Sequence, residues 1–120
     1  MKTIICDIDG TIVKYFKNHM GILANGHVPL PGVVEQMNDW ENQGHKIILI
    51  TGRRENLRKV TEKALTEIGV PFDTLIMGCA DSGRVLINDQ GKNCKAHAVS
   101  LFRDEAVSYT HLTLPTNREV

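Results

Sequence analysis

The chain lacks an apolar run long enough to cross a membrane, and its formal net charge is zero. A membrane-spanning helix needs about 18 consecutive apolar residues, and no signal-peptide pattern opens the chain, so we expect a cytoplasmic protein. The balance of 14 basic and 14 acidic residues predicts no general attraction to nucleic acid or to an anionic membrane. The three cysteines are odd in number and lack metal-ligand spacing, which favours a reducing compartment over a disulfide framework.

The 120 residues leave room for one domain with a modest core. We expect strands near residues 3–8, 46–51, 73–77 and 84–88, a further candidate strand near 97–101, and helices over 31–43 and 54–68. This alternation predicts an α/β fold, a Rossmann-like parallel sheet with flanking helices. The expected buried stripe of the second helix consists of Leu57, Val60, Ala64, Leu65 and Ile68.

The sequence Asp7-Ile8-Asp9-Gly10-Thr11 follows the first apolar run directly. A glycine there lets the backbone turn sharply, and the turn would bring both carboxylates into the crevice where open α/β sheets bind ligands. One carboxylate can act as a nucleophile and the other as a proton donor and acceptor. Because two close carboxylates repel each other, the pair also suggests Mg²⁺. The competing interpretation is a surface turn, in which Asp and Gly are common.

Two later apolar runs also end in polar residues. The run 45–50 ends in Thr51-Gly52-Arg53, which would place a hydroxyl, backbone amides and a helix N-terminus together, as in phosphate sites. Thr51 can equally be an ordinary residue of a helix N-terminus. The run 84–87 ends in Asn88-Asp89, which on its own reads as a turn. Three parallel strands would carry Asp7, Asp9, Thr51 and Asp89 to one edge of a sheet.

In this ordered set the chain resembles the haloacid dehalogenase superfamily of aspartate-nucleophile phosphohydrolases, over roughly residues 2–105. The resemblance implies that Asp7 attacks phosphorus, that Asp9 serves as general acid and base, and that Thr51 binds the transferring phosphoryl group. It implies Mg²⁺ on the Asp7 carboxylate, the Asp9 carbonyl and the Asp89 carboxylate. Gly10, Thr11, Gly52 and Arg53 are assigned to phosphate binding. Asp9 favours phosphate esters, because members that cleave carbon–halogen bonds generally lack this residue.

The family also requires a cation beside the nucleophile, and its identity is open in this chain. A frequent position follows the stretch Leu75-Ile76-Met77-Gly78, where this sequence has Cys79. We choose Arg84, and Lys92 and Lys95 are its rivals. Each of these cations can equally be a solvated surface residue.

Only about twenty residues separate Thr11 from Pro31, too few for the cap domain that covers the site in many family members. We therefore expect an open, capless domain over residues 1–105, which a second copy of the chain could cover. Such a site suits a macromolecular phosphate or a small metabolite, for instance a sugar phosphate. The insert residues that could touch substrate are Tyr15, Phe16, Lys17, His19 and His27; the two histidines can equally be surface residues.

Residues 107–116 match no strand or helix period. They do match, codon for codon, one reading frame of a common transposase-based sequencing adapter. We therefore predict that residues 106–120 are a non-native tail without function and exclude them from the fold.

Two other classes of function stay open. One is a non-catalytic phospho-ligand-binding or regulatory module on the same fold, which the unassigned cation favours and the complete pair Asp7 and Asp9 disfavours. The other is a phosphate-accepting receiver, which also gathers carboxylates and Mg²⁺. Receivers usually place the acceptor aspartate on a later strand, whereas Asp7 follows the first.

Overall fold

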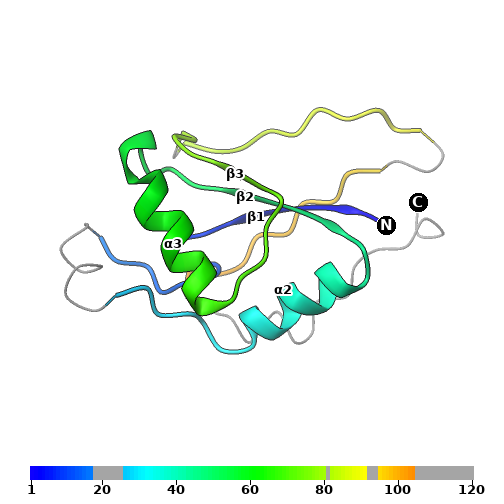
Figure 1. Ribbon diagram of the computed structural model, residues 1–120. Helices are drawn as coiled ribbons and strands as arrows, with labels where there is room; N and C mark the ends of the chain where they lie inside the picture. The colour runs from blue at the N-terminus through cyan, green and yellow to red at the C-terminus, as the bar shows by residue number, and fades with distance from the viewer. Residues whose placement is uncertain (18–25, 81, 92–94, 105–120) are drawn as a thin grey trace.

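A computed structural model of the chain describes residues 1–17, 26–80, 82–91 and 95–104. Its centre is a parallel sheet in the order β1 (Thr3–Asp7), β2 (Lys46–Ile50) and β3 (Thr74–Ile76). Figure 1 shows the three strands side by side. The strands consist largely of β-branched and apolar residues, which pack well on a pleated surface. The predicted parallel α/β architecture is confirmed.

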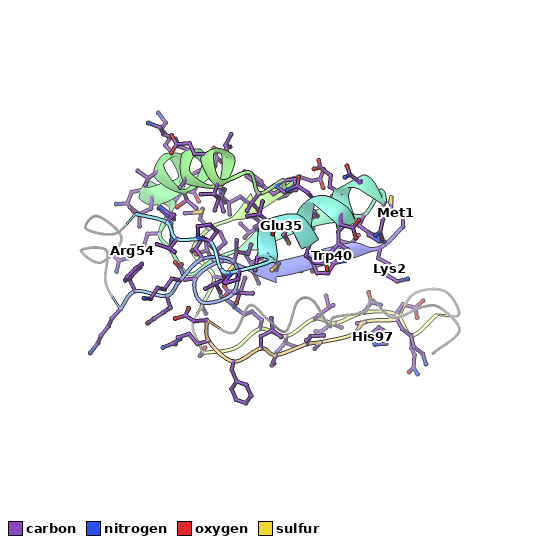
Figure 2. The ribbon with its side chains drawn as sticks, turned by 90° about the horizontal axis from the view of Figure 1, so that it is seen from below. Met1, Lys2, Glu35, Trp40, Arg54 and His97 are labelled. Carbon is purple, nitrogen blue, oxygen red and sulfur yellow. The ribbon has the colours of Figure 1, made fainter. Side chains whose placement is uncertain are left out.

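Two helices cover one face of this sheet. They are α2 (Val33–Asn42) and α3 (Arg58–Ile68), the latter preceded by a single 3-10 turn, η1 (Glu55–Leu57). Helix α3 ends at Gly69, whose φ of 86° is the left-handed conformation typical of glycine at this position. In Figure 2 the helices lie on one side of β1, and the extended segments 82–91 and 95–104 lie on the other side.

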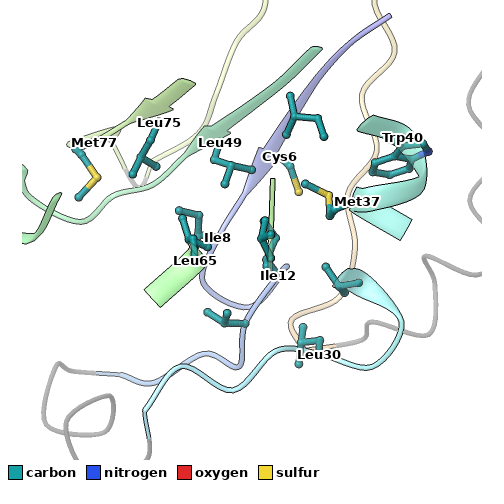
Figure 3. Close-up of a cluster of buried hydrophobic side chains, with 14 residues drawn as sticks. Cys6, Ile8, Ile12, Leu30, Met37, Trp40, Leu49, Leu65, Leu75 and Met77 are labelled. Atoms are coloured by element: carbon teal, nitrogen blue, oxygen red, sulfur yellow. The ribbon is translucent and has the colours of Figure 1, made fainter. Parts of the chain in front are cut away.

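The hydrophobic core lies between the sheet and the two helices (Figure 3). Its fully or nearly buried side chains come from the strands, the helices and the loop after β1, and they include Cys6, Ile8, Ile12, Met37, Trp40, Ile47, Leu49, Leu65 and Leu75. Ile8 and Ile12 belong to the loop that carries Asp9 and are both 0% exposed. Their burial anchors this loop to the core.

The buried stripe of α3 differs from the prediction at one position. Val60 is 56% exposed, and the neighbouring Thr61 is 0% exposed. Buried residues of a helix recur at three and four positions, and Leu57, Thr61 and Leu65 follow that spacing. The prediction considered apolar residues alone and therefore chose Val60 in place of Thr61, whose side chain faces the core although it carries a hydroxyl.

The strand predicted over residues 84–88 is wrong, because the structure assigns no strand there or at 97–101. Val85, Leu86 and Ile87 are 88%, 60% and 91% exposed. A strand needs a neighbour for its backbone groups, and this segment pairs with none of the described strands. Apolar β-branched composition without such a neighbour leaves the segment extended but unpaired.

None of the helices in the described ranges is both long and apolar enough to cross a membrane. The predicted non-native tail, residues 106–120, lies outside the described residues.

Leu49→Ala should lower the free energy of unfolding by about 2–5 kcal/mol, because it leaves a cavity in the central strand where the side chain is 0% exposed. Urea denaturation followed by circular dichroism measures the change. Val60→Ala on the exposed face of α3 is the matched control and should change the stability by less than about 0.5 kcal/mol. Equal losses in the two variants would contradict the assignment of the core.

Candidate active site

The carboxyl ends of the three strands lie side by side at one edge of the sheet. Asp7 pairs with Ile50, and Ile50 pairs with Ile76, so the strands end at the same level. The next residues join the loops, since the backbone N–H of Thr51 donates to the carbonyl of Ile76 at 3.0 Å, and that of Cys79 donates to the carbonyl of Thr51 at 2.9 Å. Asp7 and Thr51 thus lie at one sheet edge, as predicted from their motifs.

The loop after β1 folds back immediately. The backbone N–H groups of Thr11, Ile12 and Val13 all donate to the carbonyl of Ile8, at 3.1, 2.8 and 3.2 Å. Gly10 has a φ of 81°, which strains any residue with a Cβ, so the turn requires glycine. The turn places Asp9 just beyond the strand that carries Asp7.

Asp7 has its own cation. Its Oδ1 lies 3.2 Å from Nη1 of Arg84, and its Oδ2 accepts a long hydrogen bond, 3.4 Å, from the hydroxyl of Thr11. The Asp7 side chain is 33% exposed, so a ligand can reach it. Arg84, the cation chosen from the sequence, therefore lies beside Asp7, although it belongs to no strand.

Asp9 has a second, separate cation. Arg53 donates to both of its oxygens, from Nε to Oδ2 at 3.0 Å and from Nη2 to Oδ1 at 2.7 Å. Such a bidentate pair fixes the plane of the carboxylate as well as its position. The Arg53 side chain is only 5% exposed, and its backbone N–H donates to the Thr51 hydroxyl at 3.1 Å. Arg53 was predicted to bind phosphate, but in the structure its guanidinium holds Asp9.

The remaining donors of Arg53 are also engaged. Nη1 lies 2.8 Å from Nε2 of His27 and donates to the hydroxyl of Thr61 at 3.0 Å. Burial, and then the positive charge of Arg53, lower the pKa of His27 below 6.5, against the opposing effect of Asp9. The neutral imidazole can therefore accept the Arg53 hydrogen bond through Nε2. His27, predicted to face substrate or solvent, instead supports Arg53.

The third predicted metal ligand is not part of this group. Asp89 is exposed on the extended segment 82–91, and within the described ranges no three His, Cys, Asp or Glu side chains are placed to hold a metal ion. Mg²⁺ prefers six oxygen ligands in near-octahedral geometry. Asp7, Asp9 and Asp89 are oxygen donors of the type that Mg²⁺ prefers, but with Asp7 and Asp9 each paired to an arginine and Asp89 apart from them, the described side chains do not form a complete Mg²⁺ site.

The other predicted residues are spread around the two carboxylates. Thr51 is 1% exposed, and Gly52 is exposed. Lys95 is half-buried on the segment 95–104, and Lys17 is exposed. His19 and Lys92 lie outside the described residues.

A segment late in the chain closes on the loop after β1, and the sequence motifs did not reveal it. The backbone N–H of Asp104 donates to the carbonyl of Gly10, and its Oδ1 accepts from the backbone N–H of Tyr15, both at 2.8 Å. The guanidinium of Arg103 stacks on the Tyr15 ring at 3.7 Å. Neither residue belongs to a recognisable motif. The sequence analysis missed Thr61 as well. The signal that could have found it is its spacing, four positions from both Leu57 and Leu65, which puts this polar residue on the apolar face of the helix.

The domain should lose stability as the pH falls below about 6.5, in part because the unfolded chain binds a proton at His27 more readily than the folded chain does. A histidine whose pKa is lowered by folding binds more protons when unfolded, so its contribution is present above 6.5 and is lost toward its folded pKa. His27→Asn, which does not titrate, should show a shallower loss in urea unfolding between pH 7.5 and 5. His45→Gln controls for the other histidine with a lowered pKa. Parallel curves for the unaltered chain and His27→Asn would contradict this assignment.

Solved structures of other proteins resemble this chain. Two structures of a Pnkp1/Rnl/Hen1 complex, one described as an RNA repair complex, contain a similar chain with 28% identity and a TM-score of 0.56. The matches cover 70% and 69% of this chain but only 30% and 27% of those chains. A target protein from Vibrio cholerae has 19% identity and a TM-score of 0.57, with 95% of this chain and 91% of that chain covered.

A D,D-heptose 1.7-bisphosphate phosphatase from B. bronchiseptica, complexed with magnesium and phosphate, has 20% identity and a TM-score of 0.46, with 70% of this chain and 54% of that chain covered. No curated protein gives a significant match. Residues 4–108 match the family of haloacid dehalogenase-like hydrolases. Because this match spans most of the chain and the fold agrees with it, the protein belongs to the haloacid dehalogenase-like hydrolase family.

Proposed function

We propose that the protein is a phosphatase that hydrolyses a phosphate monoester through an aspartyl-phosphate on Asp7. The observation that carries the proposal is the pair of carboxylates at the end of β1 and just after it, each beside a different arginine. Asp7 is the more accessible of the two, with 33% of its side chain exposed against 25% for Asp9. A partly exposed carboxylate at the end of a strand can approach phosphorus, and the firmly held one can handle protons.

The two steps use these residues in turn. An Asp7 oxygen forms a bond to phosphorus while the bond to the leaving oxygen breaks, and Asp9 donates a proton to that oxygen. Asp9 then takes a proton from a water molecule, whose oxygen attacks the phosphorus and releases phosphate from Asp7. Asp9 recovers its proton in the second step, so the cycle balances.

The charge that spreads over the transferring group needs nearby donors. The Arg84 guanidinium, beside Asp7, is one. The Thr51 hydroxyl accepts the N–H of Arg53, and a hydroxyl that accepts one hydrogen bond still has its own hydrogen to donate. Gly10, Thr11 and Gly52 complete the proposed phosphate site. The backbone N–H groups of Gly10 and Thr11 already donate to the carbonyls of Val13 and Ile8, so the proposed donors here are the Thr11 hydroxyl and the backbone N–H of Gly52.

We include Mg²⁺ in the proposal, with the Asp7 carboxylate, the Asp9 carbonyl and the Asp89 carboxylate as its donors. Bound there, the ion would neutralise negative charge on the phosphate oxygens. The support is the chemistry of these oxygen donors, which are the type that Mg²⁺ prefers. Asp89 would have to reach the end of β1, and an assay with Mg²⁺ and with a chelator tests the dependence on metal.

A small phosphorylated metabolite, such as a sugar phosphate, is the proposed substrate, bound in a domain without a large cap and partly covered by a second copy of the chain. The balanced charge of the chain favours such a substrate over nucleic acid. The 28% identity to a chain of an RNA repair complex supports a second class, a terminal phosphate of RNA. Both classes offer the same monoester to Asp7.

Asp7→Asn should abolish phosphate release, lowering kcat by about a thousandfold or more, because an amide is a poor nucleophile. The assay measures phosphate released from an aryl phosphate, a panel of sugar phosphates and an RNA oligonucleotide with a terminal phosphate, with Mg²⁺ and with a chelator. Asp39→Asn, an exposed carboxylate on α2, is the matched control and should keep full activity.

Turnover retained by Asp7→Asn would refute the proposed nucleophile. A folded chain that binds phosphate esters without turnover, and still binds them as Asp7→Asn, would indicate a phospho-ligand-binding module. A phosphoryl group that stays on Asp7 for minutes would indicate a receiver. The substrate that is hydrolysed fastest decides between the metabolite and the RNA phosphate.

Arg84→Gln should lower kcat/KM by about a hundredfold, because it removes the cation that lies 3.2 Å from Asp7. Arg84→Lys keeps the charge and should retain part of the activity. Lys95→Gln, a change at the rival described cation, should leave kcat/KM unchanged. The reverse ranking would assign the role to Lys95.

A further inference from the structure

Thr61 is a polar residue in a position that an apolar one would ordinarily fill. It is the fourth residue of α3, is 0% exposed, and lies at helical spacing between Leu57 of η1 and the fully buried Leu65. Burying a hydroxyl is unfavourable unless it finds a hydrogen-bond partner. The partner of Thr61 is Nη1 of Arg53, which donates a hydrogen bond to the hydroxyl at 3.0 Å. The buried hydroxyl is therefore satisfied by a charged group of the candidate active site.

The contacts of Arg53 form a chain from α3 to Asp9. Nε and Nη2 hold the Asp9 carboxylate along one edge of the guanidinium, at 3.0 and 2.7 Å. Nη1, at the other end of the group, meets Thr61 and His27. A planar group held at both ends keeps one orientation, whereas one held at a single end can swing. Thr61 supplies a contact from the buried core of the fold, whereas His27 belongs to the insert between Thr11 and Pro31.

We propose that Thr61 is a positioning residue for proton transfer by Asp9, acting through Arg53. This inference rests on the phosphatase activity proposed above. Thr61 keeps the Arg53 guanidinium in plane with the Asp9 carboxylate, and Asp9 therefore faces the leaving oxygen when it gives up its proton. Thr61 does not touch the substrate in this scheme, so its effect falls on the proton-transfer step and leaves phosphate binding unchanged.

Two variants of the full chain separate the hydroxyl from the packing. Thr61→Val replaces the hydroxyl by a methyl group of similar size, and Thr61→Ser keeps the hydroxyl. Each is assayed with phenyl phosphate, whose leaving oxygen needs a proton, and with 2,4-dinitrophenyl phosphate, whose leaving group departs without one. The ratio kcat/KM reports the first step, in which Asp9 acts as the acid.

Thr61→Val should lower kcat/KM for phenyl phosphate about tenfold and for dinitrophenyl phosphate less than about twofold, with KM almost unchanged. Thr61→Ser should stay near the unaltered chain on both esters. Equal losses on both esters, or a loss in Thr61→Ser as large as that in Thr61→Val, would overturn the inference in favour of simple packing. Circular dichroism checks that both variants are folded.

A spectroscopic measurement separates this inference from the proposed function. If the unaltered chain releases no phosphate, the proposed function fails, and the Nε–H signal of Arg53 in a ¹H–¹⁵N NMR spectrum tests the positioning alone. Thr61→Val should shift or broaden that signal, and Thr61→Ser should preserve it. An identical signal in all three proteins would show that Thr61 does not position Arg53.

Discussion

The constraint that shapes the site is the burial of a charge, the guanidinium of Arg53. Only 5% of this side chain is exposed, and removing a partner from a buried ion pair typically costs about 3–5 kcal/mol. Its partners therefore have to be in place whenever the domain is folded. They come from three separate parts of the chain, with Asp9 after β1, His27 in the insert and Thr61 on α3. Arg53 thus joins the loop after β1 to α3. Among the hydrogen bonds of the described residues, α3 meets the site only through Arg53.

The sheet and both helices could be predicted from the sequence because their signals are local. The apolar runs that became β1, β2 and β3 are bounded by turn residues, and both helices end within one residue of their predicted ends, α3 just before Gly69. Their starts were predicted too early, because α2 begins at Val33, two residues after Pro31, and the 3-10 turn η1 precedes α3. Asp7, Asp9 and Thr51 could also be placed, since they lie at or just beyond the end of a strand and parallel strands end at a common edge. These predictions needed only the pattern around each residue and one rule of topology.

What failed depended on contacts that sequence neighbours do not determine. The run Val85–Ile87 has the composition of a strand, but a strand exists only with a partner, and without one Asp89 does not join Asp7 and Asp9. Thr61 was passed over in favour of Val60 because hydrophobicity was the criterion, and a hydroxyl becomes a core residue only when its partner is known. Arg84, in contrast, was chosen as the cation nearest in sequence to the position of Cys79, and the structure places it beside Asp7.

The two arginines differ in a way that matches the two tasks proposed for their carboxylates. Arg84 is 40% exposed and meets Asp7 through one contact of 3.2 Å, an arrangement worth about 1 kcal/mol or less in water. An incoming phosphate, with its greater charge, can take over this guanidinium and leave Asp7 free to attack. Arg53 cannot be recruited so easily, because the substrate would have to replace contacts with Asp9, His27 and Thr61 together. In the proposed mechanism the nucleophile, which must be released, is thus paired loosely, and the acid–base residue, which must keep its orientation, is paired in the core.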